Sequence, residues 1–498
     1  MKLRDLPPEI LSLTLQTLQQ SDLYQCIFVN QRFNAAAIQH LWRTPVIHNH
    51  QRFKLFIKCL RSNKKPVGSW VRHFRITWGG GGSNTATAAT STFNGVEHHH
   101  HREQQQEQRQ QRRRLQQDYY FDDDDCLLLL PYVPQLEEFA VQNSDRLTDR
   151  SICMIPTYCS QLEILYLKRA DITYRSAHHL GRGCKQLRKL TFDHCLKLQP
   201  MTLLPFADCP LEYLDLSGCK WINVEDTAYD IRAFKRLRHL DIICSDKTVM
   251  MNDFLSTLAS KRPSSTIVPP SSSFSSDIYL RHRQNSNSNN NYDMIMNNDD
   301  DNMVVPELVS FSMTGCNEIK DMAAIQFIEA HPHLEYLTMM ACGITDATLD
   351  AIRRYLPRLI YLDISFCHSV SMSGVRRLIR GSRLQMIGLK ACGLRKFQFP
   401  EVPCRRSDLL RQTQVDIFNE AEIDLIRNYP DALPEPIFSQ LSEEEIQQQG
   451  EQTDDNDNDE QQDEQMMQID PIDVENSDED QVAAVYALIH QSLEANIL

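Results

Sequence analysis

Cysteine recurs at one place in a repeated phrase, and a thiol at a fixed place could do several kinds of chemistry. The phrase reads LEYLDLSGC at 211–219, LEYLTMMAC at 334–342 and LIYLDISFC at 359–367. Its last residue could be a metal ligand, half of a disulfide, a nucleophile or a packing residue. The choice among these roles depends on how the fold places the phrases.

Other candidates for chemistry are few. The run from His98 to His101 could bind a transition metal, but its surroundings are of low complexity and no paired cysteines lie near it. The sequence contains no C-x-x-C pair, G-x-S-x-G, P-loop, H-E-x-x-H or dinucleotide fingerprint. We therefore expect no catalytic, cofactor-binding or metal site, and a protein that is not an enzyme.

The phrase is part of a longer period. An apolar-x-x-apolar-x-apolar pattern begins at leucines spaced 24 to 26 residues apart, except for one interval of 71. That interval equals one repeat plus a Ser- and Asn-rich insert of about 45 residues. A further copy is VRHFRITW at 71–78. The other copies begin at Leu136, Leu162, Leu187, Leu211, Leu237, Leu308, Leu334, Leu359 and Leu384.

Such a period is typical of a leucine-rich repeat solenoid, in which each unit contributes one short strand and one helix. We therefore predict an α/β fold of about ten units with a curved parallel sheet. The units resemble the cysteine-containing subclass of leucine-rich repeats, whose ninth position is Cys rather than Asn. The cysteines at that position are Cys195, Cys219, Cys316, Cys342, Cys367 and Cys392, and the other units have Ser144, Ala170 and Ser245.

The solenoid also predicts the role of these cysteines. Equivalent positions in successive units point the same way, about 4.8 Å apart along the stack. A tetrahedral zinc site needs four ligands that converge on one point, and parallel side chains do not converge. The total of 15 cysteines is odd, and they are spread along the chain, which favours a reducing compartment. We predict that the repeat cysteines pack in the core.

A short helical module precedes the repeats. Residues 6–45, LPPEILSLTLQTLQQSDLYQCIFVNQRFNAAAIQHLWRTP, predict three short helices with more apolar surface than they can bury alone. Periodicity leaves open whether this bundle caps the solenoid or binds another protein. The order of LPPEIL, DL, C, VN and LW resembles an F-box, the module that docks on the Skp-family adaptor of cullin-RING ubiquitin ligases.

The resemblance implies a function and a set of adaptor-binding residues. An F-box followed by such repeats is expected to be the substrate-recognition subunit of an SCF-type ubiquitin ligase. Two positions depart from the family pattern: Phe33 stands where Trp is usual, and Thr14 stands where a large aliphatic residue is usual. Thr14 could weaken the interface. The implied adaptor-binding residues are Leu6, Pro7, Ile10, Leu11, Leu23, Cys26, Val29, Phe33, Leu41 and Trp42.

A protein substrate is expected on the concave face of the strands, where the third, fifth and seventh positions of each unit point outward. Tyr213, Tyr336 and Tyr361 recur at one strand position, and tyrosine is enriched in protein interfaces. Cations are few, which disfavours recognition mainly through clustered phosphates. The predicted substrate-binding residues are Tyr166, Lys168, Lys189, Asp193, Tyr213, Asp215, Asp241, Tyr336, Tyr361 and Asp363.

Composition divides the chain into segments. Low-complexity inserts occupy 79–125 and 262–302, and their composition favours disorder, as does that of the acidic tail. The remaining boundaries are an F-box at 1–45, a linker helix at 46–70, the repeats at 71–394, a capping region at 395–441, the acidic tail at 442–480 and an amphipathic helix at 481–498.

Charge and hydropathy narrow the partners. The net charge is −14, but residues 443–480 carry 17 Asp or Glu and no Lys or Arg, so the rest of the chain has a charge of +3. This charge distribution therefore disfavours a nucleic-acid partner. No apolar run has the length of a signal peptide or membrane helix, and we expect a cytoplasmic or nuclear protein. The alternative hypothesis is a scaffold without ubiquitin transfer, whose helical bundle caps the solenoid.

Overall fold

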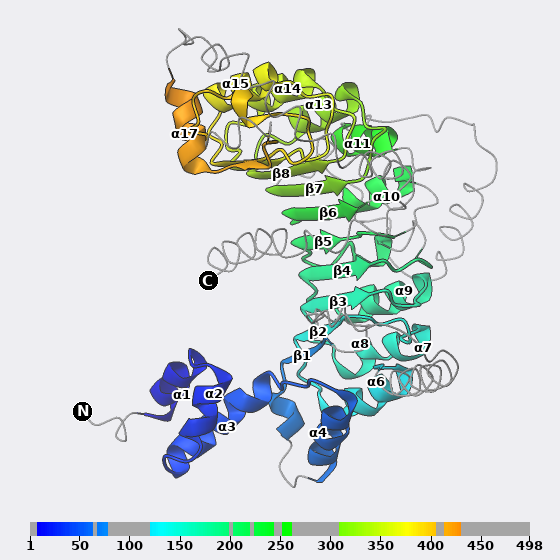
Figure 1. Ribbon diagram of the computed structural model, residues 1–498. Coiled ribbons are helices and arrows are strands. Elements are labelled where there is room, and N and C mark those ends of the chain that lie inside the picture. The colour runs from blue at the N-terminus through cyan, green and yellow to red at the C-terminus, as the bar shows by residue number, and fades with distance from the viewer. Residues whose placement is uncertain are drawn as a thin grey trace, which may run out of the picture. The chain divides into compact units, whose positions relative to one another are not determined.

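The computed structural model describes residues 7–62, 67–77, 120–198, 203–219, 224–243, 251–260, 308–404 and 413–429. Leu6, the histidine run, the Ser- and Asn-rich insert, the acidic tail and the terminal helix lie outside these residues. One sheet of 11 strands follows the order of the sequence (Figure 1). Strands β1 to β10 pair in parallel, and β11 is antiparallel to β10. The α/β repeat fold predicted from the sequence is confirmed.

The repeat units have short strands and helices of one to three turns. The strands are β1 (His73–Ile76), β2 (Glu138–Val141), β3 (Ile164–Lys168), β4 (Lys189–Asp193), β5 (Tyr213–Asp215), β6 (His239–Ile243), β7 (Ser310–Thr314), β8 (Tyr336–Met340), β9 (Tyr361–Asp363), β10 (Met386–Gly388) and β11 (Ile417–Phe418). The helices are α6 (Asp123–Leu129), α7 (Asp149–Ile152), α8 (Ile155–Tyr158), α9 (Tyr174–Gly183), α10 (Val224–Ile231), α11 (Met251–Ala259), α13 (Asp321–Ala330), α14 (Asp346–Tyr355), α15 (Met372–Gly381) and α17 (Glu420–Asn428).

The chain divides into two compact units, one of Met1–Leu394 with Gln414–Asn428 and one of Arg395–Thr413 with Tyr429–Leu498. The second unit contains the 3-10 helix η7 (Lys396–Gln398). There the backbone N–H of Lys396 donates to the carbonyl of Thr413 at 2.9 Å. All the strands and α-helices given above belong to the first unit.

Three helices form the N-terminal bundle: α1 (Pro8–Gln16), α2 (Gln20–Cys26) and α3 (Gln31–Arg43). Proline is tolerated at the start of α1 because the first helical N–H groups have no acceptor within the helix. The Asn30 side chain caps α3 by accepting from the N–H groups of Arg32 and Phe33. The core of the bundle consists of Leu11, Leu15, Leu23 and Ala37, with Cys26, Phe33, Ala36 and Leu41 packed against it.

An aromatic cluster joins helix α4 (His50–Ser62) to the first two strands. Phe56 of α4 stacks on Phe74 of β1 at 6.2 Å between ring centroids, and Phe74 stacks on Phe139 of β2 at 6.0 Å. Phe53 and Phe121 complete the cluster, and both are fully buried. These rings cover the N-terminal end of the repeat core.

The boundary of the first insert needs correction. The composition of the sequence places Asp122 to Asp125 in the low-complexity insert at 79–125. The structure instead uses Asp122 as the N-cap of α6, where its side chain accepts from the N–H of Asp125, and the next three aspartates form the first helical turn. Acidic side chains there interact favourably with the helix dipole, so this acidic run begins a helix.

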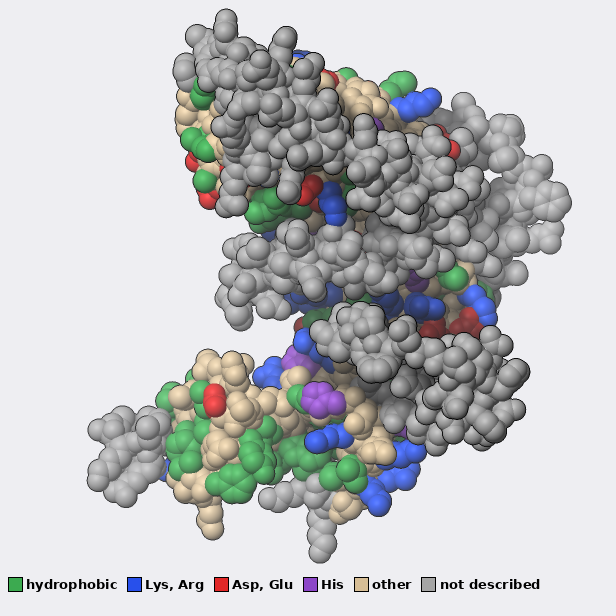
Figure 2. All heavy atoms as spheres, in the orientation of Figure 1, with side chains coloured by type: hydrophobic (Ala, Val, Ile, Leu, Met, Phe, Trp, Pro, Cys, Tyr) green, Lys and Arg blue, Asp and Glu red, His purple; other side chains and the backbone are tan. Residues whose placement is uncertain are grey.

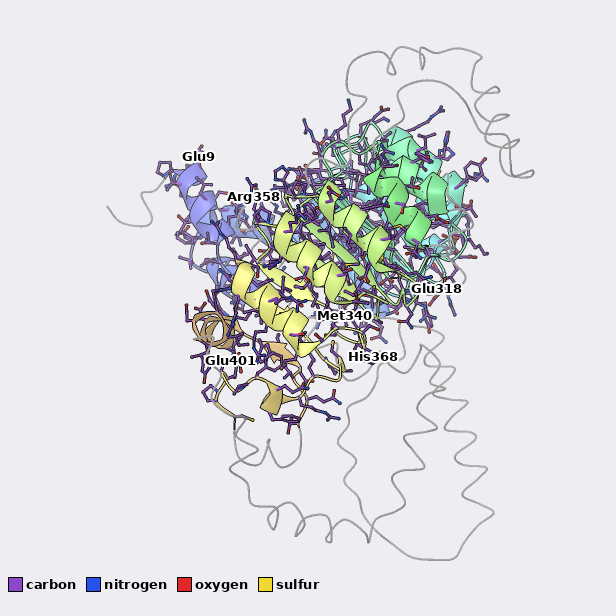
Figure 3. The ribbon with its side chains drawn as sticks, turned by 90° about the horizontal axis from the view of Figure 1, so that it is seen from above. Glu9, Glu318, Met340, Arg358, His368 and Glu401 are labelled. Atoms are coloured by element: carbon purple, nitrogen blue, oxygen red, sulfur yellow. The ribbon has the colours of Figure 1, made fainter. Side chains whose placement is uncertain are left out.

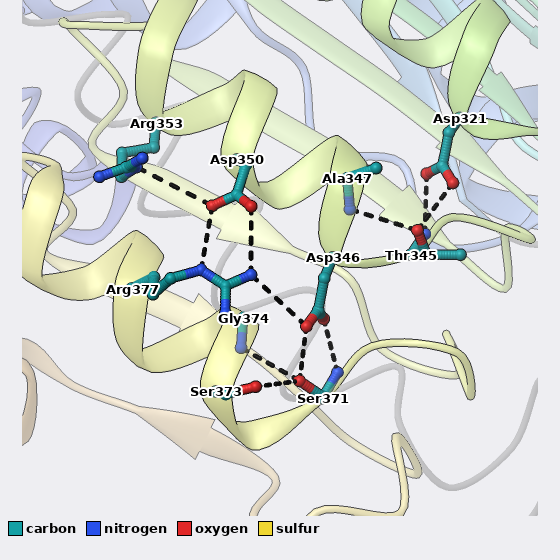
Figure 4. Close-up of polar contacts among 10 residues, drawn as sticks. All are labelled: Asp321, Thr345, Asp346, Ala347, Asp350, Arg353, Ser371, Ser373, Gly374 and Arg377. Atoms are coloured by element: carbon teal, nitrogen blue, oxygen red, sulfur yellow. Dashed lines mark hydrogen bonds and ion pairs between the residues drawn. The ribbon is translucent and has the colours of Figure 1, made fainter.

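Aspartates connect the starts of successive helices (Figure 4). The Asp321 carboxylate accepts hydrogen bonds from the Thr345 N–H at 2.9 Å and the Thr345 hydroxyl at 2.7 Å. It also accepts one from the Thr348 hydroxyl at 2.5 Å. The same pattern links Asp123 to the start of α7 and Asp149 to the start of α9. We call this arrangement the aspartate ladder. It connects the cap of each of these helices to the preceding unit.

The last rung of the ladder differs. Asp346 accepts from the N–H and hydroxyl of Ser371, but the third donor is missing because Gly374 occupies its place. A Cβ at Gly374 would lie 2.2 Å from Asp346 Oδ1. Arg377 approaches Asp346 at 3.6 Å instead and forms a closer pair with Asp350 at 3.1 Å.

From β2 to β5 and from β7 to β10, the strand turns into the following loop at the eighth position of its unit, through a residue with positive φ. Non-glycine examples are Asn143, Arg169, His194, Ala341, Phe366 and Ala391. The turn aims a backbone N–H at the next unit: Arg169 donates to the Asp193 carbonyl and Phe366 to the Lys390 carbonyl, both at 2.7 Å. These bonds offset the cost of the left-handed backbone. Figure 3 labels Glu318 and His368 in loops that follow strands, and Arg358 in a turn that precedes one.

Candidate protein-binding surfaces

One face of the sheet carries the polar positions of the repeats. Along β3 and β8, buried residues alternate with partly exposed ones, as expected for strands with one face toward a core. The register places Tyr213 opposite His239, and Asp215 opposite Asp241. We call the surface formed by the third, fifth and seventh positions of the units the polar strand face.

All ten predicted substrate-binding residues lie on the polar strand face, in two groups. Between the groups, β7 presents the small residues Ser310 and Ser312. The first group, on β3 to β6, is Tyr166, Lys168, Lys189, Asp193, Tyr213, Asp215 and Asp241, and the second, on β8 and β9, is Tyr336, Tyr361 and Asp363.

The first group contains carboxylates in unequal surroundings. Asp193 pairs with the Lys168 ammonium at 3.1 Å and contacts the His194 ring. The Tyr213 hydroxyl donates to Asp241 Oδ2 at 2.6 Å. Desolvation raises the pKa of the Asp215 carboxyl to about 6 and that of Asp241 to about 7, and repulsion from Asp215 adds to the rise at Asp241. Two carboxylates on neighbouring strands therefore oppose each other's ionisation.

Replacing Asp241 by Asn should stabilise the free protein at pH 8. Because the pKa of Asp241 is higher in the folded state than its ordinary value of 3.8, the folded state binds the proton more tightly and loses stability as the pH rises from about 4 to 7. Asn carries no charge but accepts a weaker bond from Tyr213, so we expect a gain of about 2 kcal/mol in the free energy of unfolding.

Urea denaturation of both proteins at pH 8 and at about pH 4 checks this expectation. Near pH 4 the Asp241 carboxyl is largely protonated when folded, so the gain should disappear there. A variant no more stable than the wild type at pH 8 would contradict the raised pKa.

The N-terminal bundle exposes an apolar face. Phe28 is 70% exposed, Leu13 61%, Val29 59%, Tyr24 54% and Ile10 46%. We call these five residues the apolar F-box face. Figure 2 shows hydrophobic side chains gathered over this bundle. Large apolar side chains gathered on so small a bundle indicate contact with a protein.

The predicted adaptor-binding residues divide between this face and the interior. Pro7, Ile10 and Val29 are exposed, and Leu6 lies outside the described residues. Leu11 and Leu23 are 3% and 4% exposed, so we reassign them from the adaptor interface to the bundle core. Partly buried members of the set are Cys26, Phe33 and Leu41, which pack against that core, and Trp42, which stacks on Phe56 at 5.6 Å.

Sequence comparison with the family pattern missed three members of the apolar F-box face: Leu13, Tyr24 and Phe28. The signal that could have found them is their alternation with the core residues of α1 and α2, at helical spacing. Thr14, which departs from the family pattern, is also exposed, and its hydroxyl donates to the Ile10 carbonyl at 2.8 Å. Thr14 thus satisfies its hydroxyl within α1.

The repeat cysteines pack in the core, and four of them, Cys195, Cys219, Cys367 and Cys392, bond backward along the stack. The Cys219 thiol contacts the Phe192 carbonyl at 2.9 Å, Cys367 contacts that of Met339 at 3.1 Å, and Cys392 contacts that of Ile364 at 3.1 Å. Burial raises the pKa of the Cys367 thiol to about 12 and that of Cys392 to about 11. The thiolate, which is the nucleophilic form, is therefore scarce at neutral pH.

Two searches of the described residues bear on other kinds of site. They contain no group of three or more His, Cys, Asp or Glu side chains that could hold a metal ion. Within the same residues, no helix has the length and apolar character needed to cross a membrane.

Residues 3–76 match the family model of the COS11 F-box domain. The match runs from the first helices through α4 to the end of β1. Residues 3–76 are therefore an F-box domain, and the chain combines it with a leucine-rich repeat solenoid.

Three solved structures are similar to this chain at low identity. The crystal structure of the Rad7 and Elc1 complex in yeast matches at 15% identity and a TM-score of 0.34, over 53% of this chain and 64% of the other. The TLR13–ssRNA13 complex matches at 15% and 0.31, over 54% and 30%. An internalin (inlF) from Listeria monocytogenes matches at 13% and 0.26, over 53% and 76%. The chain thus spans less than two thirds of the first two matched chains.

Proposed function

We propose that this chain is the substrate-recognition subunit of an SCF-type ubiquitin ligase. The F-box binds a Skp-family adaptor, and through it a cullin-RING ligase, while the repeats bind the protein to be ubiquitinated. The observation that carries the proposal is the apolar F-box face, with Phe28 at 70% exposure within a matched F-box domain. Such a face is suited to docking on a folded partner.

The bundle contacts the repeats in a way that favours this function over the scaffold hypothesis. Its contact runs through α3, where Trp42 stacks on Phe56 and the Arg43 carbonyl accepts from the Arg72 N–H at 2.9 Å. If capping were the bundle's main role, its most apolar surface should be the one that is covered. The apolar F-box face is exposed instead. Deletion of residues 1–45 would uncover Phe56 as well, so substitutions on that face distinguish the hypotheses better.

In this proposal the chain positions the substrate and contributes no reacting group. A bound substrate is held at high effective concentration next to the ligase, and orientation of this kind accelerates transfer without a catalytic residue on the receptor. None of the 14 described cysteines is part of a disulfide, and we place the activity in the cytoplasm or nucleus, where thiols stay reduced.

We further propose that the polar strand face binds the substrate. Tyrosines at one strand position supply contact area and a hydroxyl at low entropic cost. The opposed carboxylates of Asp215 and Asp241 reduce stability at neutral pH, and such costs are characteristic of functional sites.

The test combines purification with proximity labelling. The full chain should co-purify with a Skp-family adaptor and a cullin, and labelling should find proteins that accumulate when the proteasome is inhibited. A Tyr213→Ala, Tyr336→Ala, Tyr361→Ala variant should lose those proteins and keep the adaptor. The matched control is Tyr174→Ala with Tyr229→Ala, two tyrosines on helices that are 50% and 52% exposed.

Two results would contradict the proposal separately. Failure of the wild-type chain to capture the adaptor would exclude the ligase function. Unchanged labelling by the strand-face variant would exclude the polar strand face as the substrate site, without affecting the F-box assignment.

A further inference from the structure

Helix α4 presents a basic outer face that its packing role does not explain. Its inner residues, among them Phe53, Phe56 and Leu60, are buried in or beside the aromatic cluster. Its outer residues include four exposed cations: Arg52, Lys54, Lys58 and Arg61. We call these four residues the α4 basic face.

Within the described residues, Asp125 contacts α4 through His50 at 3.1 Å but pairs with none of the four cations of the α4 basic face. Among the described residues, no Asp or Glu side chain forms an ion pair with any of the four cations. The sequence contains no Asp or Glu between Asp22 and Glu97. Within the described part of the chain, the four charges are therefore not neutralised by ion pairs.

The positions of these cations would also destabilise an isolated helix. Lys54 and Lys58 are four residues apart, and like charges at that spacing repel. Arg52 lies in the first turn, where the positive end of the helix dipole disfavours cations. Only Arg61, in the last turn, is placed favourably for the dipole. A helix that keeps cations at such positions is better explained by an anionic partner than by its own stability.

The position of α4 indicates which partner this is. The helix lies within the matched F-box domain of residues 3–76, and its Phe56 stacks on Trp42 of α3. In Figure 2 the Lys and Arg side chains over α4 and the hydrophobic side chains over the F-box bundle are visible on the same face. Leu55, among the cations, is 60% exposed. An exposed apolar side chain beside cations favours a protein surface over a nucleic-acid backbone.

We propose that the α4 basic face is a second contact for the protein that docks on the F-box, and that it accepts an acidic segment of that protein. This inference rests on the proposed function, because it assumes an adaptor on the apolar F-box face. Charges at the rim of an interface act mainly on the rate of association and on its salt dependence. Contacts on the apolar F-box face then mainly determine how slowly the complex dissociates.

The test measures association of the full chain with a purified Skp-family adaptor by biolayer interferometry. An Arg52→Gln, Lys54→Gln, Lys58→Gln, Arg61→Gln variant should associate about tenfold more slowly at low salt, with a nearly unchanged dissociation rate. At about 500 mM NaCl the difference should largely vanish because salt screens the attraction. The matched control, Arg182→Gln, Arg236→Gln, Arg358→Gln, Arg383→Gln, removes four exposed repeat cations and should behave as wild type.

The outcomes separate this inference from the proposed function. No adaptor binding by the wild-type chain would remove the proposed function itself. Adaptor binding with equal rates for the wild type and the α4 variant would overturn only the role of the α4 basic face. The role of the α4 basic face in adaptor binding would also be overturned if the α4 variant bound the adaptor normally but lost affinity for a short RNA duplex or for vesicles of anionic lipid. Circular dichroism of the variant confirms that α4 is still folded.

Discussion

Replacing Phe28 by Asp is expected to weaken binding of the adaptor by about 100-fold or more. The Phe28 side chain is 70% exposed in the free chain, and its ring packs edge-on against that of Tyr24, another member of the apolar F-box face, at 5.3 Å between centroids. A buried aromatic anchor of a protein interface typically contributes 2 kcal/mol or more, and an aspartate would also bring an unpaired charge into the contact. Affinity measured by calorimetry with purified adaptor checks the loss.

The fold should tolerate this change because the Phe28 side chain is largely outside the bundle core. A matched control is Met322→Asp on α13, which removes a side chain of the same 70% exposure from the repeats. Both variants should melt within a few degrees of the wild type, and only the F-box variant should lose the adaptor. Equal affinity of the two variants would show that the adaptor docks elsewhere or not at all.

Replacing Asp321 by Ala is expected to lower the free energy of unfolding by about 3 kcal/mol. The substitution removes the acceptor for three hydrogen bonds and leaves the N–H of Thr345 without its partner. Although burial raises the pKa of the Asp321 carboxyl, the bonds from Thr348 and Thr345 outweigh it and hold the pKa below its ordinary value. Denaturant titration followed by circular dichroism measures the loss.

Asp350 provides the control for this rung of the ladder. It is also a helical aspartate near the same units, but its carboxylate is 41% exposed and pairs with Arg377 on the surface. Exposed ion pairs contribute little, so Asp350→Ala should change stability by less than about 0.5 kcal/mol. Similar losses in the two variants would mean that the ladder contributes no more than an ordinary surface charge.

The repeat fold could be predicted because its signal is periodic. The leucines that start the units, from Leu136 to Leu384, are at most 1% exposed, because each occupies the equivalent buried position of its unit. The alternation that follows each leucine also placed the polar positions, and Tyr213 and Asp241 face the same way as predicted. A one-residue error in register would have reversed those faces.

Features that depend on contacts between distant residues could not be predicted in this way. The aspartate ladder joins residues about 25 positions apart in the sequence. Asp122 to Asp125 have the composition of a low-complexity acidic tract, but they form the start of helix α6. Family resemblance located the F-box, but it did not separate the core residues Leu11 and Leu23 from exposed ones such as Phe28. The α4 basic face was missed because each of its charges is ordinary by itself. Its significance comes from four cations on one helix that form no ion pair with the described acidic residues.

The aspartate ladder and the repeat thiols give the stack a direction. Each helix cap on the ladder is completed by a carboxylate from the preceding unit, and Cys219, Cys367 and Cys392 contact backbone carbonyls that also come earlier in the chain. These cap and thiol groups of a newly made unit therefore find their partners in units that have already left the ribosome, whereas the turn N–H groups wait for the next unit. Such a chain can consolidate one repeat at a time during synthesis, starting from the end that carries the F-box.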